Sequence, residues 1–318
     1  MALTLTESAK LTQNELHRGV LETFVLNSAV LDRIPFKGIQ GNAYAYNEEA
    51  SLPGVAFRGV NEAYTESTGT VNQKVETLKI MGGDADVDRY IEQTQSNIND
   101  QRAVQLAMKI KALVYAFQNA FFNGNETSNP KEFDGLRTRL VGNQVIDAGP
   151  NGLPVIGSSD SDIFALLDKL DELLAAVPGI DGTNGVIYAN AAIIQKLRSA
   201  MRRLKIDSIV ESDVAGKRTI EWNGVPLHPA GATPAGIQIL AQTETLGTSE
   251  VTSSIYAVKY GEDVDDQGVT GLWNGGLDVR DLGELQEKPV YRHRIEFYPT
   301  LALFSGKAAA RLRGVINA

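Results

Sequence analysis

The sequence predicts a protein of the α+β class, built from a long helix, a projecting two-stranded loop and a second mixed domain inserted into the first. Three observations lead to this prediction. A helical pattern without Gly or Pro runs from Thr94 to Phe122, a turn-rich segment over residues 36–80 is bounded by two alternating runs, and a strongly alternating strand begins near residue 287.

Composition excludes several classes of protein. The chain has 318 residues, of which 43% are apolar, so it can bury one large core or two modest ones. Its net charge of −9 argues against a general attraction to nucleic acid or to anionic membranes. It contains no cysteine, which removes disulfides, thiolate metal sites and a cysteine nucleophile. The N-terminus lacks a signal-peptide pattern and no apolar run is long enough to span a bilayer, so we expect a soluble, unsecreted protein with no membrane partner.

The first segment is predicted to be a helical arm. Thr12 and Glu15 have the spacing of a capping box at a helix start. Leu16, Val20 and Phe24 then lie on one side of the helix, which ends before Pro35. No neighbouring element is available to cover that side, so we expect a distant surface to do so.

The next segment is predicted to be an extended loop. Asn42–Tyr46 and Val71–Ile80 alternate as strands do, and turn formers with little apolar material lie between them. Because an isolated two-stranded ribbon is marginal in water, we expect another subunit to stabilise it. The charged residues of the loop have a net charge of −3, which predicts a basic docking surface. They are Glu48, Glu49, Arg58, Glu62 and Glu66.

The long helix is predicted to pack on two sides. At about 1.5 Å per residue, the pattern from Thr94 to Phe122 gives a rod of roughly 43 Å. One face contains Leu106, Ile110, Leu113, Phe117 and Phe121, and nearly the opposite face contains Val104, Met108, Tyr115 and Phe122. A helix that is apolar on two sides is usually sandwiched between two surfaces.

The acidic clusters are predicted to be surface features. The aspartates of Gly82–Asp88 alternate, so a strand would present them on one face, where calcium is conceivable but a solvated face is commoner. Asp263–Gly268 begins like a calcium loop, but the twelfth position is Asn274 instead of glutamate, so we expect a polar turn. We predict no metal site.

A second mixed domain follows. An amphipathic helix over residues 159–177, a buried strand at Gly185–Ala189 and a helix over residues 190–204 are well signalled. Further strand-like pieces occur at residues 218–222, 236–241, 253–260 and 269–273.

The final segment alternates from Tyr291 to Phe297 as a half-exposed strand, and Pro299 is expected to end it. We expect this strand to pair near residues 36–45 and 75–88, which makes the second domain an insertion in the first.

Catalytic motifs are absent from the sequence. It has no dinucleotide or phosphate-binding glycine motif and no nucleophile elbow, and His17, His228 and His293 lie in an arm, a loop and a strand. We therefore predict neither an enzyme nor a cofactor. A hydrolase or lyase that uses the carboxylates of the second domain is the weakest alternative considered.

The order of these parts resembles the major capsid protein of tailed bacteriophages. Leu16–Phe24 and Leu31–Phe36 resemble the family's N-terminal arm, Gly82–Arg89 resembles the approach to its spine helix, and Phe121–Asn125 with Phe133–Leu136 resembles the exit. The resemblance covers essentially the whole chain and implies the capsid fold shared with encapsulins and herpesvirus capsid floors.

The resemblance implies five parts. They are an N-terminal arm (1–35), an extended loop with flanking strands (36–80), a peripheral domain with the spine helix (81–157), an axial domain (158–284), and the returning strand and C-terminus of the peripheral domain (285–318).

The resemblance also implies a function and partners. The chain would form pentamers and hexamers of an icosahedral shell around double-stranded phage DNA, which it contacts non-specifically. Assembly would occur in the host cytoplasm, with a portal and a possible decoration protein. Because the arm begins close to Met1, scaffolding would be either a separate protein or a segment that has already been removed, and the initiating Met favours a separate protein. An encapsulin-type compartment that packages a cargo enzyme is the alternative.

The extended loop would lie on a neighbouring subunit. Some family members join subunits there through a loop lysine, but residues 47–70 contain none, so we expect no such cross-link. We expect the loop glutamates to meet a basic strip on the adjacent peripheral domain. The candidates for that strip are Arg137, Arg139, Arg292 and Arg294.

Overall fold

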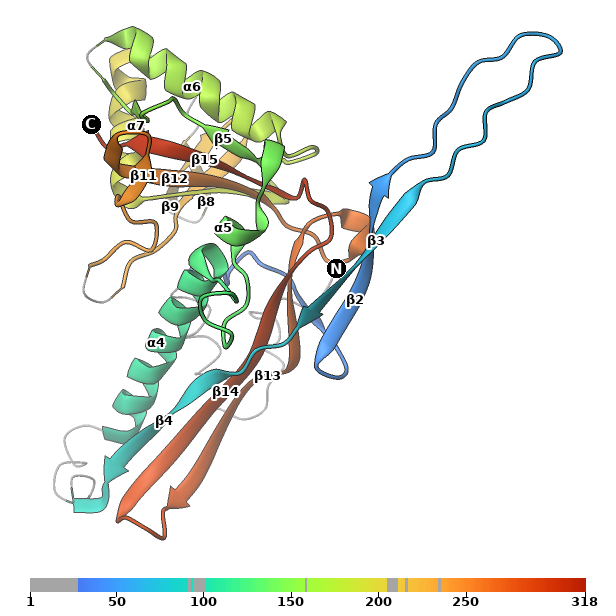
Figure 1. The fold of residues 1–318 in the computed structure, drawn as a ribbon. Helices are drawn as coiled ribbons and strands as arrows, with labels where there is room; N and C mark the ends of the chain where they lie inside the picture. Colours follow the sequence, from blue (N-terminus) through green and yellow to red (C-terminus); the bar gives the residue numbers. More distant parts are fainter. Residues whose placement is uncertain are drawn as a thin grey trace.

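The computed structural model describes residues 28–90, 93, 101–157, 159–204, 211–214, 217–233 and 236–318. The predicted arm helix before residue 28 and the predicted first turns of the long helix, residues 94–100, lie outside the described residues. Within them, the chain forms two packed bodies, each built around a sheet, and a two-stranded ribbon that projects from the region where they meet (Figure 1). The predicted α+β class is confirmed. No helix in this part of the chain is long and apolar enough to cross a membrane.

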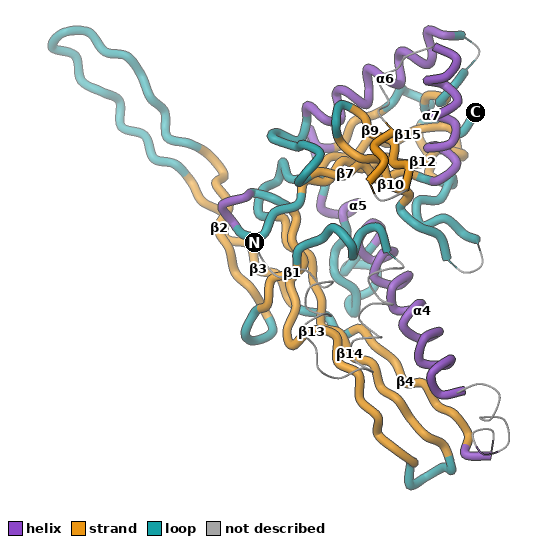
Figure 2. The backbone as a smooth tube through the Cα atoms, turned by 180° about the vertical axis from the view of Figure 1, so that it is seen from behind, coloured by secondary structure: helices purple, strands orange, loops and turns teal. Residues whose placement is uncertain are grey.

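The first sheet has the strand order β1-β13-β14-β4. The strands are β1 (Phe36–Gly38), β13 (Val269–Glu284), β14 (Val290–Leu303) and β4 (Met81–Asp88). As predicted, the C-terminal strand β14 returns to the segment near residue 81 and pairs antiparallel with β4. Helix α4 (Gln101–Asn123) lies along one face of this sheet, as Figure 2 shows. Ile295 and Phe297 of β14 are buried in the core that this helix and the sheet share.

Pro299 does not end its strand, which corrects the prediction. Strand β14 continues through Pro299 to Leu303. Proline removes a ladder donor, but the register of β13 shifts between Trp273 and Leu277, beside Pro299, so the ladder is already interrupted there. The carbonyl of Pro299 still accepts a hydrogen bond from the Lys79 amide at 3.1 Å.

Helix α4 is enclosed on two sides only near its C-terminus. Leu106, Ile110 and Phe117 are buried as predicted, and Phe122 is buried with its ring 5.5 Å from that of Tyr188 in the second body. On the predicted second face, however, Val104 is 42% exposed and Met108 is 59% exposed. The prediction of two buried faces is wrong for these positions among the described residues, because the second body packs only against the last turns of the helix.

Two glycines fix the exit from α4. A Cβ added at Gly124 would lie 2.3 Å from the carbonyl oxygen of Phe133, and one added at Gly135 would lie 2.4 Å from that of Ala120. The Gly135 amide donates to the Gly124 carbonyl at 2.9 Å. The chain therefore needs glycine at both positions to bring the backbone of α5 (Leu136–Arg139) against the end of the spine helix.

The second sheet has nine strands in the described residues, and its main path is β5-β15-β12-β7-β10-β9-β8. Helices α6 (Asp160–Ala175) and α7 (Ala191–Leu204) pack on it through one apolar cluster. A short 3₁₀ turn, η1, precedes β5, and another, η2, separates β12 from β13. The bounds are η1 Gly142–Gln144, β5 Val145–Asp147, β6 Leu153–Pro154, β7 Gly185–Ala189, β8 Glu211–Val214, β9 Lys217–Trp222, β10 Val225–Pro229, β11 Glu244–Leu246, β12 Ser249–Lys259, η2 Val264–Asp266 and β15 Ala309–Ile316.

Sheet membership does not follow the expected part boundaries at residues 157 and 284. Strand β13, placed in the axial part, pairs with β14 in the first sheet, and β15, placed in the peripheral part, pairs with β12 in the second. The chain crosses between the sheets in the short connection between β14 and β15. Residues 236–241 form no strand, contrary to expectation. The buried Ile239 and Leu240 lie in a loop whose carbonyls accept hydrogen bonds from the Asn123 and Asn190 side chains.

Candidate intersubunit surfaces

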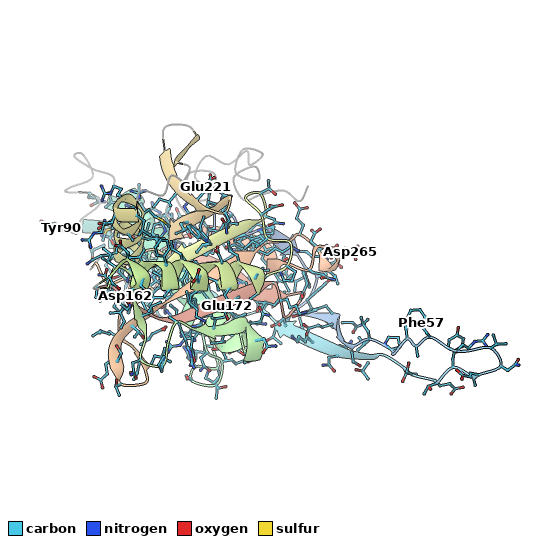
Figure 3. The ribbon with its side chains drawn as sticks, turned by 90° about the horizontal axis from the view of Figure 1, so that it is seen from above. Phe57, Tyr90, Asp162, Glu172, Glu221 and Asp265 are labelled. Carbon is cyan, nitrogen blue, oxygen red and sulfur yellow. The ribbon has the colours of Figure 1, made fainter. Side chains whose placement is uncertain are left out.

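The extended loop is a ribbon at its base and an unpaired excursion beyond it. Strands β2 (Ala43–Ser51) and β3 (Thr70–Thr77) pair antiparallel up to Ser51 and Thr70. Residues 52–69 then form no strand and run far out from the body (Figures 1 and 3). The predicted strand pair is confirmed.

A partly buried ion pair connects the base of this loop to α5. Arg139 of α5 donates to both carboxylate oxygens of Glu76 in β3, at 2.5 and 2.6 Å. The Tyr46 hydroxyl donates to the Leu303 carbonyl at 2.9 Å and lies 3.2 Å from Glu76. Burial and the nearby charge of Glu76 raise the pKa of Tyr46. Burial alone would lower the pKa of Arg139, but the hydrogen bonds to Glu76 outweigh it and raise that pKa.

Glu48 provides a second attachment of the loop. Its carboxylate lies 2.6 Å from the Lys74 ammonium and accepts the Gly306 amide at 2.6 Å. This predicted docking residue therefore ties β2 to β3 and to the turn before β15. The side chain of Glu49, the adjacent candidate, lies outside the described residues.

Two other predicted docking residues shape the tip of the loop. Glu62 accepts the Gly59 amide at 2.8 Å, and Arg58 donates to the Glu62 carbonyl at 3.2 Å. The Arg58 guanidinium also lies 5.0 Å from the centre of the Tyr64 ring. These contacts close the outer turn upon itself, while Glu66 is exposed on the returning arm.

Apolar side chains along the loop are the feature that the sequence analysis missed. Each of five large side chains is at least 66% exposed, and Phe57, partway along the loop in Figure 3, is fully exposed. They are Leu52, Val55, Phe57, Val60 and Tyr64. The expectation of little apolar material in the loop was wrong. The alternate spacing of Val55 and Phe57 in a segment of turn formers was the available signal. Large apolar side chains at such positions indicate an interaction surface, because they are not expected in a loop that stays in solvent.

The candidate basic strip is already paired within the chain. Arg292 donates to Asp86 through two nitrogens at 2.7 Å, and Arg294 donates to Asp84 at 2.8 and 3.0 Å. Arg139 is held by Glu76, as described above. Arg137 is the least engaged candidate, 49% exposed with its guanidinium 3.8 Å from Glu244.

The alternating aspartates of β4 accept hydrogen bonds from these arginines. Asp84 and Asp86 lie on one strand face, as predicted, opposite Arg294 and Arg292. The hydrogen bonds from these arginines hold the pKa of each carboxyl below its ordinary value. Asp88 accepts the Tyr90 amide at 2.8 Å. The described residues contain no group of three or more side chains that could hold a metal.

This arrangement defines a class of protein. An anchored loop that exposes several large apolar side chains far from its own core is typical of a protein that docks on another molecule. Residues 17–159 match the family model described as major capsid protein GP7. No curated protein matches the sequence.

Solved structures with the same fold include an encapsulin, a capsid and a protein of a phage. The SrpI encapsulin from Synechococcus elongatus PCC 7942 is 20% identical, with 91% of this chain and 88% of that chain covered and a TM-score of 0.67. The capsid of the native GTA particle is 14% identical over 92% and 90%, with a TM-score of 0.63. The Mycobacterium phage Bobi structure is 14% identical over 98% of each chain, with a TM-score of 0.60.

The predicted resemblance to tailed-phage capsid proteins is thereby confirmed. The fold is the one that phage capsids and encapsulins share, and the matched family is a structural capsid protein, not an enzyme. Residues 17–159 are therefore similar to a capsid protein family, and the chain as a whole has the fold of the structures named above.

Proposed function

We propose that this chain is a tailed-phage major capsid protein that assembles into pentamers and hexamers of an icosahedral shell around a double-stranded DNA genome. The family match over the arm, loop and spine region supports the phage assignment. The observation that carries the proposal is the exposed apolar loop. Its side chains lie far from the core of their own chain, so they can be buried from water by docking on another molecule.

The loop docks on the adjacent subunit mainly through its apolar side chains. Fully burying a side chain such as Phe57 contributes about 1.5–3 kcal/mol, whereas an exposed ion pair contributes about 0–1 kcal/mol. Glu48, Arg58 and Glu62 already have partners in their own chain, which leaves Glu66 and the undescribed Glu49 to meet cations of the neighbour.

Within the basic strip, Arg137 is the best receptor for such a glutamate. Arg139, Arg292 and Arg294 each hold a carboxylate of their own chain, so an incoming glutamate would have to compete for them. Arg137 is half exposed and only loosely engaged.

The remaining partners follow from the proposal. Assembly takes place in the host cytoplasm with a separate scaffolding protein and a portal, and a decoration protein stabilises a shell that has no covalent cross-link at the loop. Counterions neutralise the phosphates of the packaged DNA. A shell with a net charge of −9 per chain therefore need not bind phosphate tightly.

Electron microscopy of the purified recombinant chain, with and without its scaffold, tests the proposal. Closed shells with fivefold and sixfold capsomers are expected. A chain that stays monomeric under all assembly conditions contradicts it.

An encapsulin-type compartment is the second candidate, favoured by the TM-score of 0.67 to the SrpI encapsulin. The genes beside this one discriminate between the two. Portal, protease and terminase genes are expected for the phage shell, and a cargo enzyme with a targeting peptide is expected for the compartment.

A further inference from the structure

Helix α6 exposes an acidic stripe with an aromatic residue at one end. The helix contains five acidic residues and one lysine, a net charge of −4. Phe164, Asp168 and Glu172 follow one another at intervals of four residues, so they lie along one side of the helix. All three are exposed, and the Phe164 side chain is half exposed at 50%. Figure 3 shows the helix along the outer surface of the molecule, with Glu172 toward the end nearer the extended loop.

Part of this acidity has a role within the chain. Asp162 accepts the Ser159 amide at the start of the helix, and Asp171 accepts hydrogen bonds from the Trp222 indole and the Asn223 amide. Asp168 and Glu172 do not serve the fold in this way. Among the described residues, Glu172 is bonded to Lys169 of the same helix, and Asp168 has no hydrogen bond or ion pair. Their stripe is therefore available to a partner.

Helix α7 exposes the opposite charge. It contains four cationic residues and no acidic residue, a net charge of +4. Arg198 and Arg202 are exposed at an interval of four residues, so like charges are neighbours on one side of the helix. Arg202 and Arg203 lie in the last turn, where the helix dipole stabilises positive charge. Lys196 and Arg198 lie outside that turn, so the dipole does not account for their charge. Among the described residues, no carboxylate forms an ion pair with any of the four.

The two helices lie on the same face of the second sheet but over different strands. Helix α6 packs on β15 and β6, whereas α7 packs on β10, and strands β12 and β7 lie between β15 and β10. One copy of the chain thus presents an acidic stripe and a basic stripe from separate places on one body. No described ion pair joins the two helices, so the two charges are not satisfied by each other within one chain.

We propose that the α6 stripe of one subunit packs against the α7 stripe of the next around a capsomer. The inference rests on the proposed function, because it names the contact that closes the ring. Two different, complementary patches on one chain make a head-to-tail interface, and such an interface generates closed rings when the rotation fits. Opposite charges fix the register of the two helices, and Phe164 offers an aromatic face on which an arginine of the neighbour can stack.

Charge reversal tests the contact. One variant carries Arg198→Glu and Arg202→Glu, and a second carries Asp168→Lys and Glu172→Lys. The positions are exposed, so both variants should melt as the wild-type chain does. Each variant alone should raise the concentration needed for capsomer assembly at least tenfold, measured by sedimentation velocity. A Glu250→Lys, Asp265→Lys variant makes the same change in net charge as the second variant at exposed positions elsewhere, and it should assemble normally.

Mixing the two reversed variants gives the sharper result. The first variant has two acidic stripes and the second has two basic stripes, so each can pair only with the other. An equimolar mixture should therefore form rings in which the two variants alternate. Alternation closes only with an even number of subunits. The mixture should therefore recover sixfold rings in electron micrographs and no fivefold rings, while a chain with all four substitutions should form both.

Other results overturn the proposal. If the wild-type chain forms no oligomer, the proposed function fails and the helix contact fails with it. If wild-type shells form and the reversed variants assemble equally well, only the helix contact is wrong. Normal assembly of the arginine variant with weakened retention of DNA would assign the basic stripe to nucleic acid instead.

Discussion

Replacing Phe57 with alanine should weaken assembly without weakening the subunit. The side chain is fully exposed in the single chain, so its removal leaves the core untouched and should change the free energy of unfolding by less than about 0.5 kcal/mol. In the shell, the same side chain is expected to be buried on the adjacent subunit. Its loss should then cost about 2–3 kcal/mol per contact.

This cost translates into a measurable shift in assembly. At about 1.4 kcal/mol per tenfold change in an equilibrium constant, each contact weakens roughly 30- to 140-fold. Light scattering across a concentration series should show a correspondingly higher threshold for shell formation, and thermal melting should be unchanged. Val251→Ala, at a position that is 59% exposed on the second body, is the matched control and should leave the threshold where it is. An unchanged threshold for Phe57→Ala would refute apolar docking of the loop.

Three further predictions concern the subunit. Arg139→Ala leaves the partly buried Glu76 without its guanidinium partner and should lower the free energy of unfolding by about 1.5–3 kcal/mol in urea, and an unchanged free energy of unfolding would contradict a stabilising role of the pair. Gly124→Ala introduces a Cβ where a carbonyl oxygen would lie 2.3 Å away, and it should lower the melting temperature by several degrees. The pKa of Asp84 is held below the ordinary 3.8 by Arg294, so the stability it contributes is present above pH 3.8 and is lost as pH falls through the lower pKa. Asp84→Asn should therefore be less stable than the wild type at pH 7 and nearly equal to it well below pH 3, and an equal deficit at both pH values would contradict this assignment.

The local elements were predictable because their signals lie in adjacent residues. The apolar spacing from Leu106 to Phe121 and the helical pattern before Pro178 are periodic over several turns, and both helices form. The alternation of Asp84 and Asp86 likewise placed them on one strand face. Their partners were not predictable, since Arg294 and Arg292 lie about two hundred residues further on and meet them only through the pairing of β14 with β4.

The division of the chain between two sheets was also beyond sequence reasoning. The apolar patterns of strands β13 and β15 are compatible with either sheet. Only the long-range pairing with β14 and β12 determines which sheet each strand joins. The prediction that Pro299 ends its strand was wrong for a related reason. A proline normally ends a paired strand, but here a bulge on the neighbouring strand makes its missing donor harmless.

The candidate docking residues were also only partly predictable from the sequence. Net charge identified the extended loop as unusual, but it did not distinguish Glu48 and Glu62, which serve the loop's own structure, from residues free to contact a neighbour. In the proposed docking, burial of the apolar side chains around Phe57 contributes more free energy than those charges do, and the alternate spacing of Val55 and Phe57 marks them in the sequence.

A cryo-electron microscopy reconstruction of shells from the recombinant wild-type chain tests the central claim most directly. The expected map has fivefold and sixfold capsomers in which residues 52–69 of each subunit lie on its neighbour and the Phe57 side chain is buried there. Shells in which Phe57 faces solvent, or a chain that forms no shell, would contradict it.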